Sequence, residues 1–209
     1  LSIRRQRQMC IRDRSLGGVF YDCVFAGAIT VGADAVFTGN FTFSTDGNAL
    51  GGAMAVRKDG LQYAAETGAI TIGPNPSFIN NFAYSGKTVA YGGVIYSDGD
   101  ISFSDGVTFI NNYAKTSGGA ITMGGKCDLL ALTKDALFSG NMAGGVVIGQ
   151  SDDGFPVVEN GIANAIDMNG FLFSSLYTPN LTLAAEEGRE IRFNDPITSR
   201  NEDPGRPMT

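Results

Sequence analysis

The chain alternates apolar and polar side chains over short stretches, which is the pattern of strands with one buried face. Ile101–Ser104 and Val107–Phe109 both follow it. Turn-forming residues separate these stretches, in Ser97–Asp100 and Ser104–Gly106. No segment sustains a helical period over about twelve residues, and Ala131–Leu137 comes nearest. The pattern therefore predicts an all-β chain of short strands.

Two motifs recur along the chain at related spacings. The first is a glycine followed by small apolar residues, and its anchor glycines are Gly27, Gly52, Gly68, Gly93, Gly119 and Gly145. Their spacings are 25, 16, 25, 26 and 26 residues. The second is Phe-x-x-Asn, with copies at Phe37–Asn40, Phe78–Asn81, Phe109–Asn112 and Phe138–Asn141. Because the total spacing holds while the gap between the two motifs slides, we expect coils of fixed circumference with variable corners.

Short strands in each repeat, with no helix between them, predict a parallel β-helix with coils of about 25 residues. A single coil cannot bury its own apolar face, whereas stacked coils enclose a continuous interior. Equivalent side chains then form columns, so we expect Phe78, Phe109 and Phe138 to stack. The motif asparagines should hydrogen-bond along the same axis. We interpret the short interval 52–68 as a compressed coil or a two-strand detour.

Composition excludes several classes of function. Of the 209 residues, 43% are hydrophobic and 17% charged, which favours a folded chain over a disordered one. Histidine is absent, so a Ser-His-Asp triad and a His-ligated metal are excluded. The net charge of −6 makes nucleic acid an unsuitable partner. No apolar run reaches the ~18 residues of a transmembrane helix.

The three cysteines, Cys10, Cys23 and Cys127, have no metal-ligand spacing. We interpret them as packed free thiols, with a Cys23–Cys127 bridge as the alternative. A secreted disulfide scaffold of this size normally carries an even and denser set.

The first fifteen residues differ from the rest and suggest three regions. Five of the 15 basic residues lie there: Arg4, Arg5, Arg7, Arg12 and Arg14. A basic arm that binds membrane or nucleic acid is one hypothesis. The run Arg7–Arg14 also resembles a translated sequencing adapter, so we favour a non-native or disordered leader over 1–15, without stable contacts. The β-helix should then span 16–198, and 199–209 should be a polar linker or truncated end. A fragment of this kind is expected to leave an apolar coil edge near 17–30.

The repeats resemble those of the polymorphic outer-membrane proteins, which are autotransporters. The resemblance rests on Gly51–Met54, Gly92–Ile95 and Gly118–Ile121, on the Phe-x-x-Asn copies, and on the run Leu181–Ile197. It implies a right-handed β-helical passenger domain at the bacterial cell surface, outer membrane or outside the cell. The family also implies attachment to the outer membrane through a C-terminal barrel, which we expect to be missing from this chain.

The leading functional hypothesis is a passenger fragment that acts as a non-enzymatic adhesin or display stalk. We expect no catalytic, cofactor-binding or metal-binding residues and no cofactor. The partner is then an unknown surface ligand, protein or glycan, and not nucleic acid. Surface contacts are expected from loops near 57–66, 97–106, 126–136 and 151–161.

Two alternatives remain open. A β-helical polysaccharide lyase or hydrolase needs convergent carboxylates and a cation on one face of neighbouring coils. Its candidates here are Asp98, Asp100 and Lys126, with Asp105 close by and Asp152-Asp153 in another repeat. Turn residues in water are the simpler interpretation of these carboxylates. The second alternative is a self-associating surface-layer protein that pairs through exposed strand edges.

Overall fold

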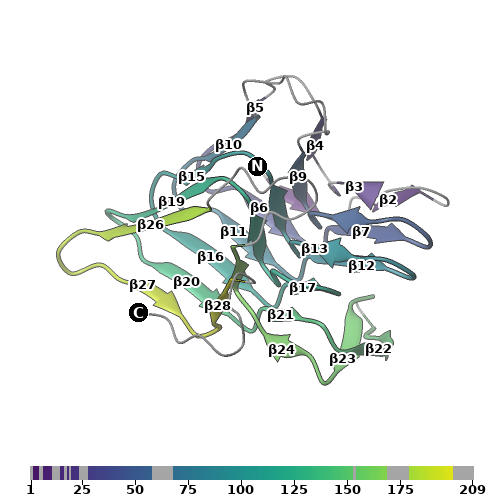
Figure 1. Cartoon of the computed structure of the whole chain (residues 1–209). Coiled ribbons are helices and arrows are strands. Elements are labelled where there is room, and N and C mark those ends of the chain that lie inside the picture. The colour runs from purple at the N-terminus through teal and green to yellow at the C-terminus, as the bar shows by residue number, and fades with distance from the viewer. Residues whose placement is uncertain are drawn as a thin grey trace.

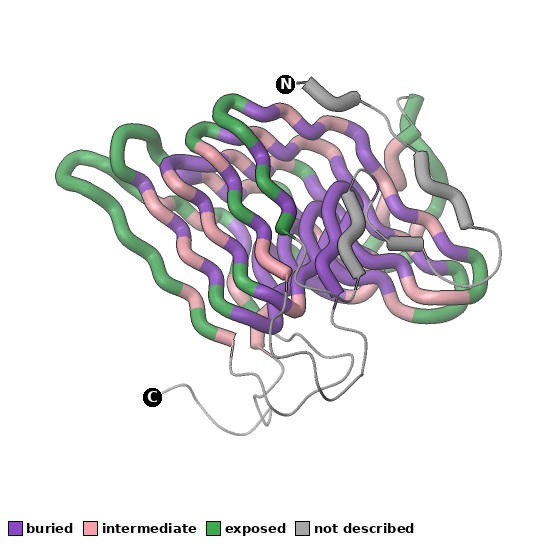
Figure 2. The backbone as a smooth tube through the Cα atoms, turned by 90° about the horizontal axis from the view of Figure 1, so that it is seen from above, coloured by how far each residue is buried: buried purple, intermediate pink, exposed green. Residues whose placement is uncertain are grey.

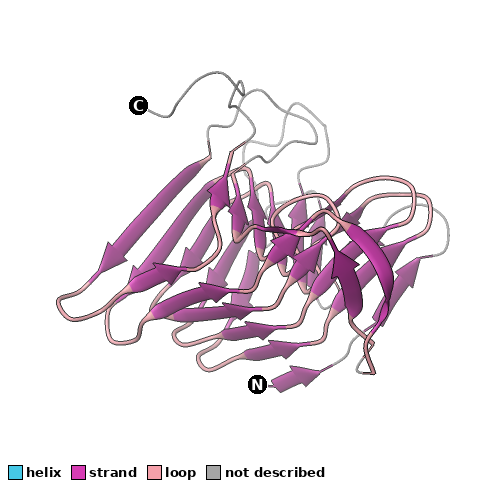
Figure 3. Ribbon diagram, turned by 90° about the horizontal axis from the view of Figure 1, so that it is seen from below, coloured by secondary structure: helices cyan, strands magenta, loops and turns pink. Residues whose placement is uncertain are grey.

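The computed structural model describes residues 28–57, 68–152, 154–168 and 179–199, together with Gly18 and the strand backbone at 2–4, 7–10, 15–16 and 20–23. Every regular element in these ranges is a β-strand, and the strands wind into stacked coils (Figures 1 and 3). Within the same ranges, no helix has the length and apolar character needed to cross a membrane.

Four of the six sheets in the described ranges have five or six strands. The first has the order β1-β6-β11-β16-β20-β27, with strands Ser2–Arg4, Val36–Thr38, Ser77–Ile79, Val107–Ile110, Ala136–Ser139 and Ile191–Phe193. The second is β26-β19-β15-β10-β5, with strands Asn180–Ala185, Lys126–Ala131, Ile101–Phe103, Ala69–Ile72 and Ala28–Val31. The third is β2-β7-β12-β17-β21-β24, with strands Arg7–Cys10, Phe41–Ser44, Phe82–Ser85, Tyr113–Ala114, Met142–Ala143 and Ile162–Ala163.

The remaining strands form three further sheets. The fourth sheet is β13-β8-β3, with strands Ala90–Tyr91, Ala49–Leu50 and Ser15–Leu16. The fifth is β28-β25-β18-β14-β9-β4, with strands Ile197–Thr198, Ile166–Asp167, Ile121–Met123, Ile95–Ser97, Met54–Arg57 and Phe20–Cys23. The sixth holds β22 and β23, Val146–Gln150 and Pro156–Glu159. Pairing is parallel in the first five sheets except between β21 and β24, and the predicted parallel β-helix is confirmed.

The coils are wound from turns of different length. Equivalent asparagines are separated by 41 residues from Asn40 to Asn81, by 31 to Asn112 and by 29 to Asn141. The anchor glycines of the sequence therefore lie at two different corners of the coils. Gly52, Gly93 and Gly119 stack on one another, and spacings of 25 and 16 residues together make one 41-residue coil. The predicted compressed coil at 52–68 lies largely outside the described residues.

A phenylalanine column fills the interior, as the sequence predicted. Figure 2 shows that buried residues recur along the successive coils. Ring centroids are 4.7 Å apart from Phe78 to Phe109 and from Phe109 to Phe138. The column extends to Phe37 at 5.1 Å and to Phe193 at 4.5 Å. All five rings are stacked nearly parallel, so each coil adds one aromatic contact of roughly 0.5–1.5 kcal/mol beyond its area burial.

A ladder of buried asparagines runs beside this column. Asn81 Oδ1 accepts hydrogen bonds from Asn40 N and Nδ2, at 3.0 and 2.9 Å. The same pattern repeats from Asn81 to Asn112 and from Asn112 to Asn141. Each of the later three amides also donates Nδ2 to the carbonyl of a stacked phenylalanine. At the last coil an aspartate takes the place of asparagine, and Asp195 accepts from Asn141 N and Nδ2, both at 2.8 Å.

Strands of the leader extend two of the sheets. The backbone of β1 pairs in parallel with β6, and β2 pairs with β7. This pairing differs from the expectation that the leader makes only incidental contacts. Backbone donors and acceptors at a strand edge favour the addition of an extended chain. The origin of the leader stays a prediction, as do the domain boundaries. The coil edge predicted near 17–30 falls mostly outside the described side chains.

Cys127 is a free, fully buried thiol in β19. Burial raises its pKa to about 12, with a further contribution from the charge of Asp128. It therefore behaves as a small core side chain and does not form the bridge to Cys23 that the sequence left open.

Candidate functional site

The carboxylates proposed for an enzyme have separate hydrogen-bond partners. Asp98 accepts a hydrogen bond from the Tyr96 hydroxyl at 2.7 Å, within its own coil. Asp100 Oδ1 accepts from the backbone N–H of Lys126 at 2.9 Å, in the next coil. The Lys126 ammonium instead pairs with Asp128, at 2.7 Å. Among the described residues, no three acidic or cysteine side chains come together as a metal site.

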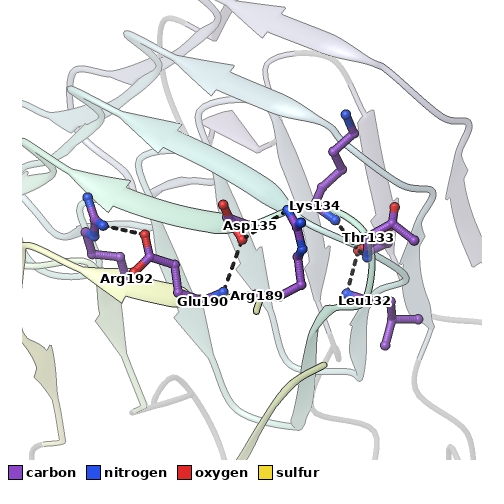
Figure 4. A network of polar contacts seen from close by, with 8 residues as sticks. Leu132, Thr133, Lys134, Asp135, Arg189, Glu190 and Arg192 are labelled. Atoms are coloured by element: carbon purple, nitrogen blue, oxygen red, sulfur yellow. Dashed lines mark hydrogen bonds and ion pairs between the residues drawn. The ribbon is translucent and has the colours of Figure 1, made fainter. Parts of the chain in front are cut away.

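Asp105 holds the turn of the neighbouring coil, and Figure 4 shows the residues of that turn. Its Oδ1 accepts from the backbone N–H groups of Leu132, Thr133 and Lys134, at 2.7, 2.9 and 3.2 Å. Its Oδ2 accepts from the Thr133 hydroxyl. Burial alone would raise the pKa of Asp105, but these four hydrogen bonds outweigh burial and lower it to about 2. This carboxylate is therefore structural.

We expect Asp105→Asn to lower the free energy of unfolding by about 1–3 kcal/mol at pH 7, because one amide cannot accept all four hydrogen bonds. The folded-state pKa lies below the unfolded value, so the carboxylate stabilises the fold above about pH 4 and this contribution is lost as pH falls toward 2. The difference from wild type in thermal unfolding should accordingly shrink between pH 7 and pH 2.5. The exposed Asp152→Asn is the matched control and should show little difference at either pH. An undiminished gap at pH 2.5 would contradict the assignment.

The rest of this turn is joined to the last coil by exposed polar contacts (Figure 4). Asp135 accepts from the backbone N–H of Glu190 at 3.1 Å and lies 3.7 Å from the Arg189 guanidinium. Arg192 pairs with Glu190. Exposed ion pairs of this kind contribute about 0–1 kcal/mol each. The turn 132–135 is therefore a solvated surface.

A hairpin at 144–163 leaves the coil stack and offers a different surface. Gly144 and Gly145 both adopt left-handed backbone, with φ of 72° and 77°, and they turn the chain out of β21. The tip is closed by Ser151, whose N–H donates to the Phe155 carbonyl at 2.8 Å and whose Oγ accepts from Phe155 N–H at 3.1 Å. Figure 1 places β22 and β23 outside the stacked coils, beyond β24.

The hairpin gathers exposed apolar side chains. Six large hydrophobic residues in the described ranges are markedly exposed, and four belong to 146–162: Val146 at 61%, Ile148 at 55%, Val157 at 41% and Ile162 at 71%. We call these four the hairpin surface. The ring of Phe155 packs edge-on against Phe82 of β12, 6.2 Å between centroids, and this anchors the hairpin to the third sheet. Apolar residues clustered on a projecting element mark an interaction site more often than a solvated surface.

The four segments expected from the sequence to be surface loops lie in different parts of the structure. The interval 151–161 lies in the hairpin, and 126–136 forms β19 and the polar turn held by Asp105. Most of 97–106 is buried within the coils, with β15 at its centre. In 57–66 only Arg57, at the end of β9, is described.

The hairpin surface could not be recognised from its first strand, because Val146–Ile148 is an apolar run after a glycine and matches the other coil corners. The second strand carries the signal that could have predicted a hairpin, because Gly154 and Asn160-Gly161 flank Phe155–Glu159 with hairpin spacing.

The fold and this surface together define a parallel β-helix that carries a projecting apolar hairpin. Residues 106–122 match the Chlamydia polymorphic membrane protein repeat. The match spans a single coil segment that contains Phe109, Asn112 and Gly119. These are motif residues on which the resemblance was predicted, and they stack on equivalent residues of the neighbouring coils. No curated protein and no solved structure matches the chain.

Proposed function

We propose that this chain is the passenger fragment of a cell-surface autotransporter and acts as a non-enzymatic adhesin or display stalk. The single observation that carries the proposal is the repeat match at 106–122, in a coil whose Phe109 and Asn112 contacts recur in the neighbouring coils. A repeat of a membrane-protein family in a rigid coil stack suits display outside the cell.

The proposed mechanism is geometric. Stacked coils joined by the phenylalanine column and the asparagine ladder form a stiff support, because each coil is bonded to its neighbours through backbone and side chains. The hairpin surface projects from that support and supplies contact area. Repeated weak contacts from several chains on one cell then add up through effective concentration.

Among the described residues, no observation favours the enzyme alternative. Asp98, Asp100 and Asp105 bond to three separate partners, whereas a lyase or hydrolase requires its carboxylates to share one groove. Self-association through strand edges remains an outcome of the experiments below.

A display experiment tests the proposal. The full chain is displayed on a non-adherent bacterium, and cells bound to cultured epithelial monolayers are counted. We expect at least about tenfold more adherent cells than with an empty display vector, because many copies act together. The matched control carries Val146→Ser and Ile148→Ser at equal surface level and should return adhesion toward background. Equal binding with and without the chain would contradict an adhesin, and release of sugar fragments from a polysaccharide panel would favour the enzyme.

A further inference from the structure

The β22–β23 ribbon has strand edges available for pairing. Its sheet contains two strands, so in the described part of the chain one side of each strand lacks a ladder partner. Figure 1 shows β22 as the outer strand, with β23 between it and the coils. Phe155, at the start of the returning strand, is held against Phe82, which leaves β22 facing solvent. An unpaired outer strand is a template for another extended chain.

The side chains of β22 would contribute to such pairing. Val146 and Ile148 are two residues apart in the outer strand and are more than half exposed. The register passes from Val147 opposite Val158 to Gly149 opposite Val157, so Ile148 lies in a bulge and has no opposite residue. A bulge re-aims its side chain, and here Ile148 is turned to solvent. An incoming strand would find apolar contacts at these two positions.

Charge indicates the nature of the incoming strand. No lysine or arginine occurs anywhere from 136 to 188. The hairpin segment itself contains three acidic residues: Asp152, Asp153 and Glu159. A second copy of the same hairpin would bring like charges together, which is unfavourable for directly opposed strands. A cationic strand would instead be attracted to this surface.

We propose that the outer edge of β22 binds an extended segment of a partner protein, in which apolar side chains alternate with lysine or arginine. The segment adds a third strand to the ribbon. Backbone hydrogen bonds supply affinity, while the apolar contacts at Val146 and Ile148 and the negative charge of the hairpin supply selectivity. This inference rests on the proposed surface function, because it names the contact element and the partner chemistry of that surface.

A labelled octapeptide of alternating valine and lysine is the probe, and fluorescence anisotropy with the full chain is the measurement. We expect binding that weakens as salt rises from about 50 to about 500 mM. Ile148→Lys should weaken binding at least about fivefold, because it puts a like charge opposite the peptide. Leu183→Lys, the same charge change at another exposed apolar residue of the chain, should leave affinity within about twofold. Unchanged circular dichroism and melting temperature establish that both variants fold.

Three comparisons can overturn the inference. Equal binding of an alternating valine–glutamate peptide would remove charge selectivity. Equal binding of a valine–lysine peptide with internal prolines would exclude strand addition, because proline lacks the backbone donor. A chain that dimerises in solution, and becomes monomeric with Ile148→Lys, would identify a second copy as the occupant. Adhesion without peptide binding would overturn this inference alone, whereas peptide binding without adhesion would overturn the adhesin function and leave the inference standing.

Discussion

Replacing Gly93 by alanine is expected to lower the free energy of unfolding by about 4 kcal/mol or more. A Cβ atom at this position would lie 2.0 Å from the carbonyl oxygen of Gly119 and 2.6 Å from that of Tyr113. Both neighbours are backbone atoms of the adjacent coil, so no side chain can rotate away. The coils would have to separate at this corner, and the hydrogen bond from Gly93 N–H to the Gly118 carbonyl, at 2.9 Å, would be lost.

Gly149→Ala is the matched control for this substitution. No atom lies within 4 Å of the position that its Cβ would take, and its backbone does not require glycine. We expect a change within about 0.5 kcal/mol, measured by urea and thermal unfolding followed by circular dichroism. Similar stability of Gly93→Ala and wild type would show that the coils are not in van der Waals contact at this corner.

The stacked side chains could be predicted from the sequence because each column repeats one residue type. Phe78, Phe109 and Phe138 have identical surroundings in successive coils, so a single motif indicates all of their positions. Phe193 escapes the motif for a physical reason. Its partner in the asparagine ladder is Asp195, two residues later, where the motif requires an asparagine three residues later. Because of the shorter spacing and the change to aspartate, the Phe-x-x-Asn motif does not detect this coil.

Corner identity could not be predicted, because local sequence does not specify which corner a glycine occupies. The residues after Gly27 and Gly68 enter β5 and β10, which pair through Ala28 and Ala69. The residues after Gly52 and Gly93 enter β9 and β14, which pair through Met54 and Ile95. The two sets share the pattern of glycine and small apolar residues, and only register between coils separates them.

The roles of polar residues could not be predicted from local sequence either. Composition places Asp105 in a turn, but its partners lie 27 to 29 residues further along the chain, in the next coil. Its role depends on coil length, which turn composition does not give. The hairpin surface likewise depends on the chain leaving the stack at Gly144 and Gly145, since Val146 and Ile148 are exposed in the projecting strand.

The asparagine ladder has a direction, and its last residue suits that direction. Asn81, Asn112 and Asn141 each accept through Oδ1 from the preceding coil and donate through Nδ2 to the next. Asp195 accepts from Gly140 N–H at 3.0 Å and from both nitrogen atoms of Asn141. A carboxylate has no N–H group that would need an acceptor in a further coil. The aspartate therefore needs no further acceptor. Asn81 and Asn112, which hydrogen-bond to an amide on both sides, have the most hydrogen bonds to lose.

Asn112→Leu is expected to cost about 3–5 kcal/mol of unfolding free energy, although the leucine side chain has the same number and branching of non-hydrogen atoms. The substitution removes the acceptor for Asn81 N and Nδ2, which bond to Asn112 Oδ1 at 2.9 and 3.0 Å. It also removes the Nδ2 donor to the Phe78 carbonyl at 3.0 Å and to Asn141 Oδ1 at 2.8 Å. These groups are buried, so water cannot replace the lost partners without opening the stack.

Asn194→Leu tests whether the effect belongs to the ladder. Asn194 is an exposed asparagine whose Nδ2 donates to Ser139 Oγ at 3.1 Å, and its loss should cost no more than about 0.5 kcal/mol. Urea unfolding of both variants gives the comparison. Equal losses would mean that the buried amides contribute no more than surface ones. A large loss confined to Asn112→Leu would show that the ladder, like the phenylalanine column, is a main source of coil-to-coil stability. The ladder would then also supply the stiffness that a projecting hairpin needs.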